Sequence, residues 1–181
     1  VYSRNISLKN STVTRSLFDA IDIDISQVDI ENCTIAFSGN DGIDSMSSIV
    51  KIKNTNIFGS IDKGISIGEK SKILIINSKI QKNKIGVESK DMSVANIFKS
   101  SVSQNTVDIN AYKKNWQYGG GGVVYLLDYN KYSSLQKLKT DKHSIINVFD
   151  GTTILKDNIN VEYFDDINLI SDTLKSWNEN L

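Results

Sequence analysis

Charged and polar side chains recur every 22 residues in the N-terminal part of the sequence, at positions that could share one surface. One set of equivalent positions contains Asp22, Asp44, Ser66, Glu88 and Asn110. A second set, two residues further along, contains Asp24, Met46, Gly68, Lys90 and Tyr112. If equivalent positions stack in neighbouring strands, Asp22 and Asp44 lie about 4.8 Å apart. Carboxylates that close repel each other unless a proton, a base or a cation lies between them, and oxygen ligands of this kind suit Ca²⁺.

The turn before each of these positions adds further charge to the same predicted face. It carries Asp41 in one repeat, Asp62 with Lys63 in the next, and Lys84 in the one after. Two interpretations follow from the residues. They could bind a ligand or a cation, or they could be solvated side chains that form ion pairs between repeats, such as Lys63 with Asp41. Exposed pairs contribute only about 0–1 kcal/mol each, so the second interpretation implies no function.

The element that must position these residues is a repeat of apolar positions between Ile6 and Tyr112. The segments ISLKNSTV, VDIENCTI, VKIKNTNI, ILIINSKI and ANIFKSSV start 22, 22, 23 and 22 residues apart, at Ile6, Val28, Val50, Ile73 and Ala95. Small or apolar residues alternate with others in each segment, which is the period of a half-buried strand. A second register with the same spacing contains Ile21, Ile43, Ile65, Val87 and Ile109. About three short strands per 22 residues predict a coil whose turns stack in parallel around a continuous apolar core.

An asparagine occupies the same place in four copies of the repeat, at Asn10, Asn32, Asn54 and Asn77. Asparagine tolerates the left-handed backbone region, and its amide can donate and accept hydrogen bonds along a stack. We therefore predict a structural corner with an asparagine ladder, not a ligand site. Lys99 takes this place in the fifth copy, so the ladder should end there. The next position always carries a small side chain, so the single cysteine, Cys33, is predicted to pack at the bend and not to act as a nucleophile.

These repeats predict an all-β parallel β-helix with about 22 residues per coil over residues 1–164, with regular coils at 6–114 and irregular coils at 115–164. The four glycines Gly119 to Gly122 interrupt the spacing and predict a loop, used as a hinge or for a close approach of the backbone. Later strands are predicted at VVYLLDY from Val123, SIINVF from Ser144 and DGTTIL from Asp150. Residues 165–181 are predicted to be an amphipathic helix that caps the stack, because apolar residues follow at helical spacing: Ile167, Ile170, Leu174, Trp177 and Leu181.

Composition excludes some classes of partner. Twenty-one basic and twenty-one acidic residues cancel, and only two of the basic residues are arginines. The chain lacks the basic field with which proteins hold nucleic acid, so we expect no nucleic-acid partner. No apolar run reaches the roughly 18 residues needed to span a bilayer. Because the sequence starts at Val1 without an initiator methionine, we expect it to be part of a larger chain.

The repeat, with its small-residue and isoleucine strand and its row of asparagines, resembles the right-handed parallel β-helix of the pectate-lyase-like superfamily. This resemblance covers Ile6 to about Gly122. A narrower similarity is to β-helix segments beside CotH-type kinase domains of large bacterial exported proteins. It rests on DKGISIGEKS from Asp62, IGVESKDMS from Ile85 and AYKKNWQYGGGG from Ala111. The similarity implies a location outside the cell or at its surface.

The broader resemblance also implies roles for the charged face. In pectate-lyase-like enzymes, carboxylates on this face hold calcium, and a basic side chain removes the proton α to a uronate carboxylate. By position, the metal or sugar ligands would be Asp41, Asp44 and Glu88, with Asp22 added by the spacing argument. Lys63 or Lys90 would be the base, and Tyr112 would stack on a sugar ring or give up a proton. The sequence departs from these enzymes because no arginine lies near the face and its turns are short, which predicts a shallow face without walls.

The sequence therefore predicts two alternative functions. The first is a non-catalytic β-helix module of an exported or cell-surface bacterial protein, which serves as a rigid scaffold with a glycan- or protein-binding face. The regular coils and short turns support it, because they make a stiff rod with little pocket. The second is a calcium-dependent polysaccharide lyase or uronate epimerase, with Lys90, Lys63 and Tyr112 as the catalytic residues. Both predict a polysaccharide as a partner.

Overall fold

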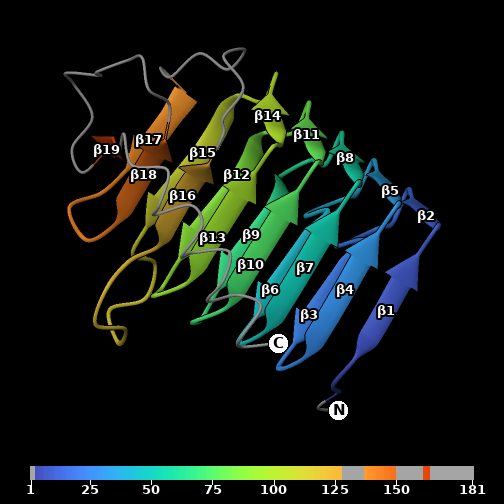
Figure 1. The fold of residues 1–181 in the computed structure, drawn as a ribbon, viewed down its shortest axis with the longest axis horizontal. Helices are drawn as coiled ribbons and strands as arrows, with labels where there is room; N and C mark the ends of the chain where they lie inside the picture. Colours follow the sequence, from blue (N-terminus) through green and yellow to red (C-terminus); the bar gives the residue numbers. More distant parts are fainter. Residues whose placement is uncertain (1–2, 128–136, 150–160, 164–181) are drawn as a thin grey trace.

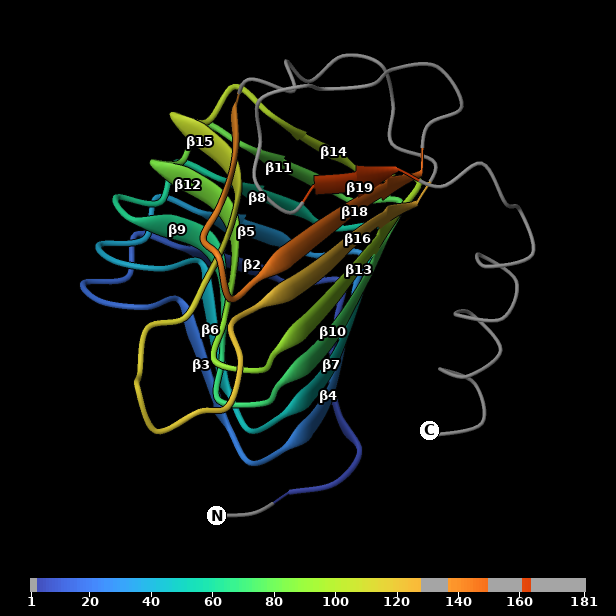
Figure 2. The same ribbon diagram turned by 90° about the vertical axis from the view of Figure 1, so that its left-hand side faces the viewer.

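The chain forms a stack of parallel coils, of which the first five are each built from three short strands. The computed structural model describes residues 3–127, 137–149 and 161–163. In these residues, three parallel sheets surround one apolar core, and Figure 2 looks along the stack and shows the sheets around it. Figure 1 shows the strands of successive coils one after another along the long axis. The predicted parallel solenoid is therefore confirmed.

In the first five coils each sheet takes one strand from each coil, and the later described strands β16 to β19 join sheets A and C. Sheet A contains β1 (Ile6–Lys9), β4 (Gln27–Glu31), β7 (Ile49–Lys53), β10 (Lys72–Ile76), β13 (Val94–Phe98), β16 (Val123–Leu127), β18 (Ile145–Phe149) and β19 (Val161–Tyr163). Sheet B contains β2 (Thr12–Thr14), β5 (Thr34–Ala36), β8 (Asn56–Phe58), β11 (Lys79–Gln81) and β14 (Ser101–Ser103). Sheet C contains β3 (Ile21–Asp24), β6 (Ile43–Met46), β9 (Lys63–Gly68), β12 (Ile85–Lys90), β15 (Val107–Tyr112) and β17 (Leu138–Thr140).

The apolar repeat sets the register of every sheet. Val28 pairs with Val50 in sheet A, Ile35 with Ile57 in sheet B, and Ile43 with Ile65 in sheet C. The core side chains of the inner coils are almost without exception no more than 1% exposed, so each packs against its equivalents above and below. Burial of large aliphatic side chains contributes roughly 1.5–3 kcal/mol each, which makes this column of residues the main source of stability.

The asparagine corner has the predicted conformation. Positive φ angles between 46° and 54° occur at Asn10, Asn32, Asn54, Asn77 and Lys99. The Asn32 amide donates to Oδ1 of Asn10 (3.3 Å), and the Asn54 amide donates to Oδ1 of Asn32 (3.2 Å). Among the described residues, no amide hydrogen bond joins Asn77 to Asn54, so the ladder has two links and ends one coil earlier than predicted. Asn77 and Lys99 keep the left-handed bend without it, so the backbone conformation is required even where the ladder ends.

Small hydroxyl residues form a second ladder one position further on. The Cys33 N–H donates to Thr55 Oγ1 (3.3 Å), and the Thr55 N–H donates to Ser78 Oγ (3.1 Å). Each hydroxyl also donates to a carbonyl two residues before it, as Ser78 does to Ile76 (2.8 Å). The bend therefore keeps its backbone N–H groups paired although it lies between sheets. Cys33 is 3% exposed, as its predicted packing role requires.

Beyond Tyr112 the stack continues with less regular spacing. Strands β16 and β18 lie where VVYLLDY and SIINVF predicted them, and both extend sheet A. The predicted segment from Asp150 to 155 and the predicted helix at 165–181 lie outside the described residues. In the part of the chain that is described, no helix is long and apolar enough to cross a membrane.

Variants of Asn32 can separate two contributions of the asparagine corner to stability, namely its left-handed backbone conformation and its amide hydrogen bonds. In Asn32→Ala, the left-handed backbone costs about 1–2 kcal/mol and the two amide hydrogen bonds are lost, so we expect the free energy of unfolding to fall by about 2–3 kcal/mol. Asn32→Gly should lose less, because glycine adopts a positive φ freely. Asn56→Ala, on the exposed side of β8, should have little effect. Urea denaturation measures all three, and equal values for the alanine and glycine variants at position 32 would contradict the backbone argument.

Candidate functional site

The charged residues predicted for one face do lie together on the outer side of sheet C. Strand pairing brings Asp22 beside Asp44, Asp44 beside Ser66, Ser66 beside Glu88, and Glu88 beside Asn110. Lys90 lies beside Tyr112 in the adjacent strands β12 and β15. The repeat therefore assigned these side chains to the correct face and to the correct neighbours.

Lys63 is the centre of an ion cluster at the start of strand β9. Its Nζ lies 2.5 Å from Asp62 Oδ2, 3.5 Å from Asp41 Oδ1 and 3.9 Å from Glu88 Oε1. Asp41 and Glu88 are each only 3% exposed. The predicted ion pair between Lys63 and Asp41 is confirmed. However, the interpretation of these two carboxylates as solvated side chains is wrong, because the neighbouring coils and the lysine stem exclude water from them.

The cluster determines the protonation of its members. Burial alone would lower the pKa of Lys63, but the hydrogen bond to Asp62 and the charges of Asp41 and Glu88 outweigh it and raise the pKa well above its usual range. Burial raises the pKa of Asp41 in spite of the nearby ammonium group. Burial also opposes ionisation of Asp62, yet hydrogen bonds from Lys63 and Lys84 lower its pKa. Lys63 is thus a fixed cation, which is the wrong protonation state for a general base.

Glu88 connects the cluster to the remaining candidate residues. Its Oε2 accepts a hydrogen bond from Asn110 Nδ2 (2.9 Å), whereas its buried Oε1 has no hydrogen-bond partner among the described residues. Burial, followed by the charge of Glu88, raises the pKa of Tyr112. Tyr112 therefore remains a neutral phenol at neutral pH. It can donate a hydrogen bond, but it is not poised to act as a phenolate.

Lys90 lies apart from this cluster, beside a polar cavity of about 270 Å³ at the carboxyl ends of strands β6, β9 and β12 of sheet C. Its Nζ donates to Ser66 Oγ (2.7 Å), and its side chain lies over Gly68. The cavity is lined by Asp44, Ser45, Met46, Gly68, Glu69, Lys90, Asp91, Lys114 and Asn115. Both signs of charge and an amide therefore border one hollow, which is an arrangement that can hydrogen-bond a polar ligand.

One wall of the cavity comes from the loop at 113–122 between β15 and β16, drawn in yellow in Figure 2. The buried Asp91 Oδ1 accepts the backbone N–H groups of Lys114 (2.8 Å) and Asn115 (2.8 Å) and so anchors the loop to the preceding coil. Burial, followed by the charge of Glu69, raises the pKa of Tyr118, so the loop also lies near the end of β9. The prediction of a shallow face without walls is therefore wrong, because one long loop follows the regular coils.

Glycine is required where this loop rejoins the stack. A Cβ on Gly121 would lie 1.9 Å from Ser144 Oγ, and one on Gly122 would lie 2.0 Å from the carbonyl oxygen of Ser89. The Gly121 N–H donates to the carbonyl of His143 (2.8 Å), which lies in a turn. Of the two predicted uses of these glycines, the close approach of the backbone is confirmed at both positions.

The loop also presents an aromatic residue that the sequence analysis did not select. Trp116 directly follows Asn115 and is 83% exposed, the highest value among the large apolar side chains of the described residues. Trp116 falls outside every apolar position of the repeat. This could have identified it from the sequence, because a tryptophan with a core role would occupy one of those positions. Trp116 does not line the cavity, but it lies on the same loop as Lys114 and Asn115, which do.

The four predicted metal ligands fall into two separate pairs. Asp41 and Glu88 share Lys63, which supplies their counter-charge. Asp22 and Asp44 are neighbours in register, and burial, followed by Asp24 and Asp44, raises the pKa of Asp22. Among the described residues, no three side chains of His, Cys, Asp or Glu form a group that could hold a metal ion. The four residues do not fit one calcium site, so calcium remains a prediction for the Asp22 and Asp44 pair.

Because part of the cluster is buried, removing Lys63 and removing Lys84 should change the free energy of unfolding by different amounts. Lys63→Met leaves Asp41 and Glu88 buried without a counter-charge, so we expect the free energy of unfolding at pH 7 to fall by about 3 kcal/mol. Lys84→Met is the control, because Lys84 pairs with the same Asp62 but its side chain is 65% exposed, and it should have little effect.

The loss in Lys63→Met should depend on pH. Without the ammonium group, the folded-state pKa of the buried Asp41, which burial already raises, lies further above its unfolded value. Stability is then lost as pH increases through the folded pKa and is regained on acidification. Urea denaturation at pH 4 and pH 7 should show a smaller deficit at the lower pH. A deficit that is independent of pH would mean that packing of the lysine stem, and not its charge, is responsible.

Comparison with known proteins agrees with this architecture. The family described as the right-handed β-helix region matches residues 1–161. Comparison with curated proteins and with solved structures yields no match. The matched span contains sheets B and C, sheet A up to the first residue of β19, and every residue of the face described above. The chain belongs to the right-handed β-helix family.

Proposed function

We propose that this chain is a non-catalytic β-helix module of an exported or cell-surface bacterial protein, and that it binds a polysaccharide at the sheet C cavity. The observation that carries the proposal is the pairing of this polar cavity with the exposed Trp116 on its wall loop. Sugars present hydroxyl groups at their edges and C–H groups on their faces. Polar side chains in a cavity and a flat aromatic ring at its rim complement both.

The distribution of charge also favours binding over catalysis. Lys63 is occupied by three carboxylates and stays protonated, so it cannot accept a proton from a substrate. Lys90 and Lys114 are instead cavity residues and can contact an anionic substituent of a sugar. The regular coils supply a stiff support on which this site is held. A location outside the cell, and the narrower similarity to segments beside CotH-type kinase domains, belong to the same proposal.

A calcium-dependent lyase or uronate epimerase is the second candidate. It is favoured by the adjacent positions of Lys90 and Tyr112 in strands β12 and β15, because a base and a proton donor must lie close together. In this function the Asp22 and Asp44 pair would bind Ca²⁺ and Lys90 would be the base. Glu88 Oε1, which pairs with Lys63 but has no hydrogen-bond partner among the described residues, is too deeply buried to serve either function directly.

Binding can be tested with a panel of neutral and acidic polysaccharides in the presence and absence of Ca²⁺. We expect at least one to bind, and Trp116→Ala and Lys90→Ala each to weaken that binding about tenfold, which corresponds to the loss of one important contact. Lys79→Ala, on the exposed side of sheet B, is the matched control and should bind normally. Affinity electrophoresis or calorimetry measures the difference.

The same samples separate binding from catalysis. A lyase forms unsaturated products with ultraviolet absorbance, and an epimerase changes the sugar composition of the recovered polymer. Product that disappears in Lys90→Ala would overturn the non-catalytic proposal. Failure of every polysaccharide to bind, or normal binding by both cavity variants, would overturn the glycan site itself.

A further inference from the structure

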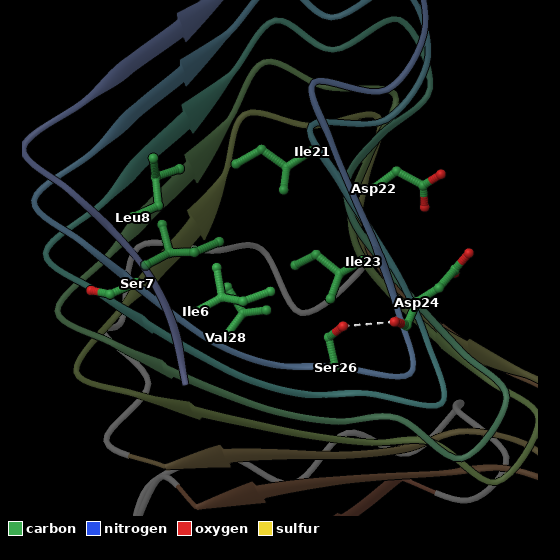
Figure 3. Close-up of a pocket in the computed structure, with 10 residues that line it drawn as sticks. Ile6, Ser7, Leu8, Ile21, Asp22, Ile23, Asp24, Ser26 and Val28 are labelled. Atoms are coloured by element: carbon green, nitrogen blue, oxygen red, sulfur yellow. Dashed lines mark hydrogen bonds between the residues drawn. The ribbon is translucent and has the colours of Figure 1, made fainter. Parts of the chain in front are cut away.

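The outer face of sheet A carries a column of outward side chains that runs along the whole stack. Residues that point into the coils alternate along each strand with residues that point outward. In Figure 3, for example, Ile6 and Leu8 point into the first coil, whereas Ser7 points away from it. Strand pairing continues the outward column from Ser7 through Asp29, Lys51, Leu74, Asn96, Tyr125 and Asn147.

The exposure of this column falls sharply between the third and fourth coils. Asp29 is exposed and Lys51 is half-buried. In the strands that follow, Leu74 is 3%, Asn96 is 1% and Asn147 is 5% exposed. Neighbouring strands flank all of these positions in the same way, so the sheet alone does not account for the difference. Further residues must therefore cover the outer face of strands β10, β13, β16 and β18, which we call the outer patch of sheet A.

The side chains of the outer patch are suited to burial. In the first three coils the outward residues of sheet A are mostly charged or polar. From β10 onward they include Leu74, Ile76, Val94, Phe98, Tyr125 and Leu127. A strand of a parallel sheet that is buried on both faces has such a nearly continuous apolar sequence. The change in sequence and the change in exposure therefore coincide.

The patch also contains a polar atom that needs a partner. Asn96 Oδ1 is buried and has no hydrogen-bond partner among the described residues. A buried acceptor without a donor is costly, because it has lost its water and gained nothing in return. The residues that cover the patch should therefore supply an N–H or O–H group.

The border of the patch is basic. Lys51 lies beside Leu74 in register, and Lys72 precedes Leu74 by two residues on the same strand. Lys99 follows β13, with its Nζ 5.1 Å from the centroid of the Phe98 ring. Among the described residues, Lys51, Lys72 and Lys99 form no ion pair. A covering segment with acidic side chains would complement this border.

Residues 164–181 combine the properties that the patch requires. At helical spacing the segment has one apolar side, formed by Ile167, Ile170, Leu174, Trp177 and Leu181. Within that side, Trp177 carries a hydrogen-bond donor, its indole N–H. The segment contains four acidic residues and one lysine, so its charge is opposite in sign to that of the border.

The segment also has the necessary reach. It follows β19, which lies four positions from β10 in the strand order of sheet A. Four strand spacings amount to roughly 19 Å. A helix over residues 165–181 would be roughly 25 Å long. The segment can therefore return from β19 across every strand of the patch.

We infer that residues 164–181 dock on the outer patch of sheet A, with their apolar side on the patch and their acidic side chains toward its basic border. One donor of the segment pairs with Asn96 Oδ1. The segment then lies along the side of the stack, and not over its end as the spacing of its apolar residues alone had suggested. The glycan site proposed above lies on sheet C, so neither proposal depends on the other.

Thiol accessibility tests this docking in the full chain. Cys33→Ser removes the only thiol, at a position where the neighbouring coils carry serine or threonine. In this background, Leu74→Cys should react with a maleimide about tenfold more slowly than Lys51→Cys, its neighbour in register. Leu174→Asp, on the apolar side of the segment, should abolish this difference. Ser176→Asp adds the same charge to the opposite side of the predicted helix and should preserve it.

Each alternative arrangement gives a different labelling result. Equally fast reaction at positions 74 and 51 would mean that nothing covers the patch. Slow reaction at position 74 that persists in Leu174→Asp would mean that another part of the chain covers it. A rate at position 74 that falls as the protein concentration rises would mean that a second copy covers it. Any of these three results would overturn the inference.

Tryptophan fluorescence gives an independent readout from the segment itself. The chain has two tryptophans, so Trp116→Phe leaves Trp177 as the reporter, and Trp177→Phe leaves Trp116, which is 83% exposed. We expect acrylamide to quench Trp177 roughly threefold less than Trp116. Leu74→Asp should remove this protection, whereas Ser7→Asp, in the same outward column, should not. Equal quenching of the two tryptophans, or full protection in Leu74→Asp, would show that the segment does not occupy the patch.

Discussion

Parallel stacking at one fixed register is the constraint on which the rest of this protein depends. Because neighbouring coils lie about 4.8 Å apart, each side chain is placed against its equivalent above and below. Aliphatic residues become a continuous core, asparagines become a ladder of amides, and hydroxyls pair with the backbone of the preceding coil. Each position of the repeat therefore forms a column of stacked side chains. Such a column is stable only if neighbouring side chains in it do not repel each other or clash.

Stacking in register makes charged side chains energetically costly, because like charges are placed next to one another. A column of carboxylates would repel along its whole length, and the structure limits this by interrupting the columns. Lys63 occupies the position that Asp41 holds one coil earlier, and its ammonium group reaches Asp41, Asp62 and Glu88. Buried in this way, the cluster contributes fixed charges and not reactive ones. The groups that can meet a ligand are those outside it, at the cavity beside Lys90 and Lys114.

The proposed binding cavity lies where the regular spacing of the repeat is interrupted. Inside the stack, each coil pairs the backbone and covers the core of its neighbours, and little surface is left for recognition. The loop at 113–122 interrupts the spacing and adds a wall and an exposed tryptophan beside sheet C. The interruptions are therefore more informative about function than the repeats.

The 22-residue period by itself determined the coil, the bend at Asn32 and the neighbours of Asp44 and Glu88, because a fixed spacing translates directly into a register of strands. Only the tertiary structure decided which charges are buried and where the wall of the cavity lies. Burial of Asp41 depends on how the Lys63 side chain covers it from the next coil. The cavity depends on a loop whose path follows from backbone contacts at Asp91, Gly121 and Gly122. Those contacts join segments without any repeated spacing, so no periodic pattern could have predicted them.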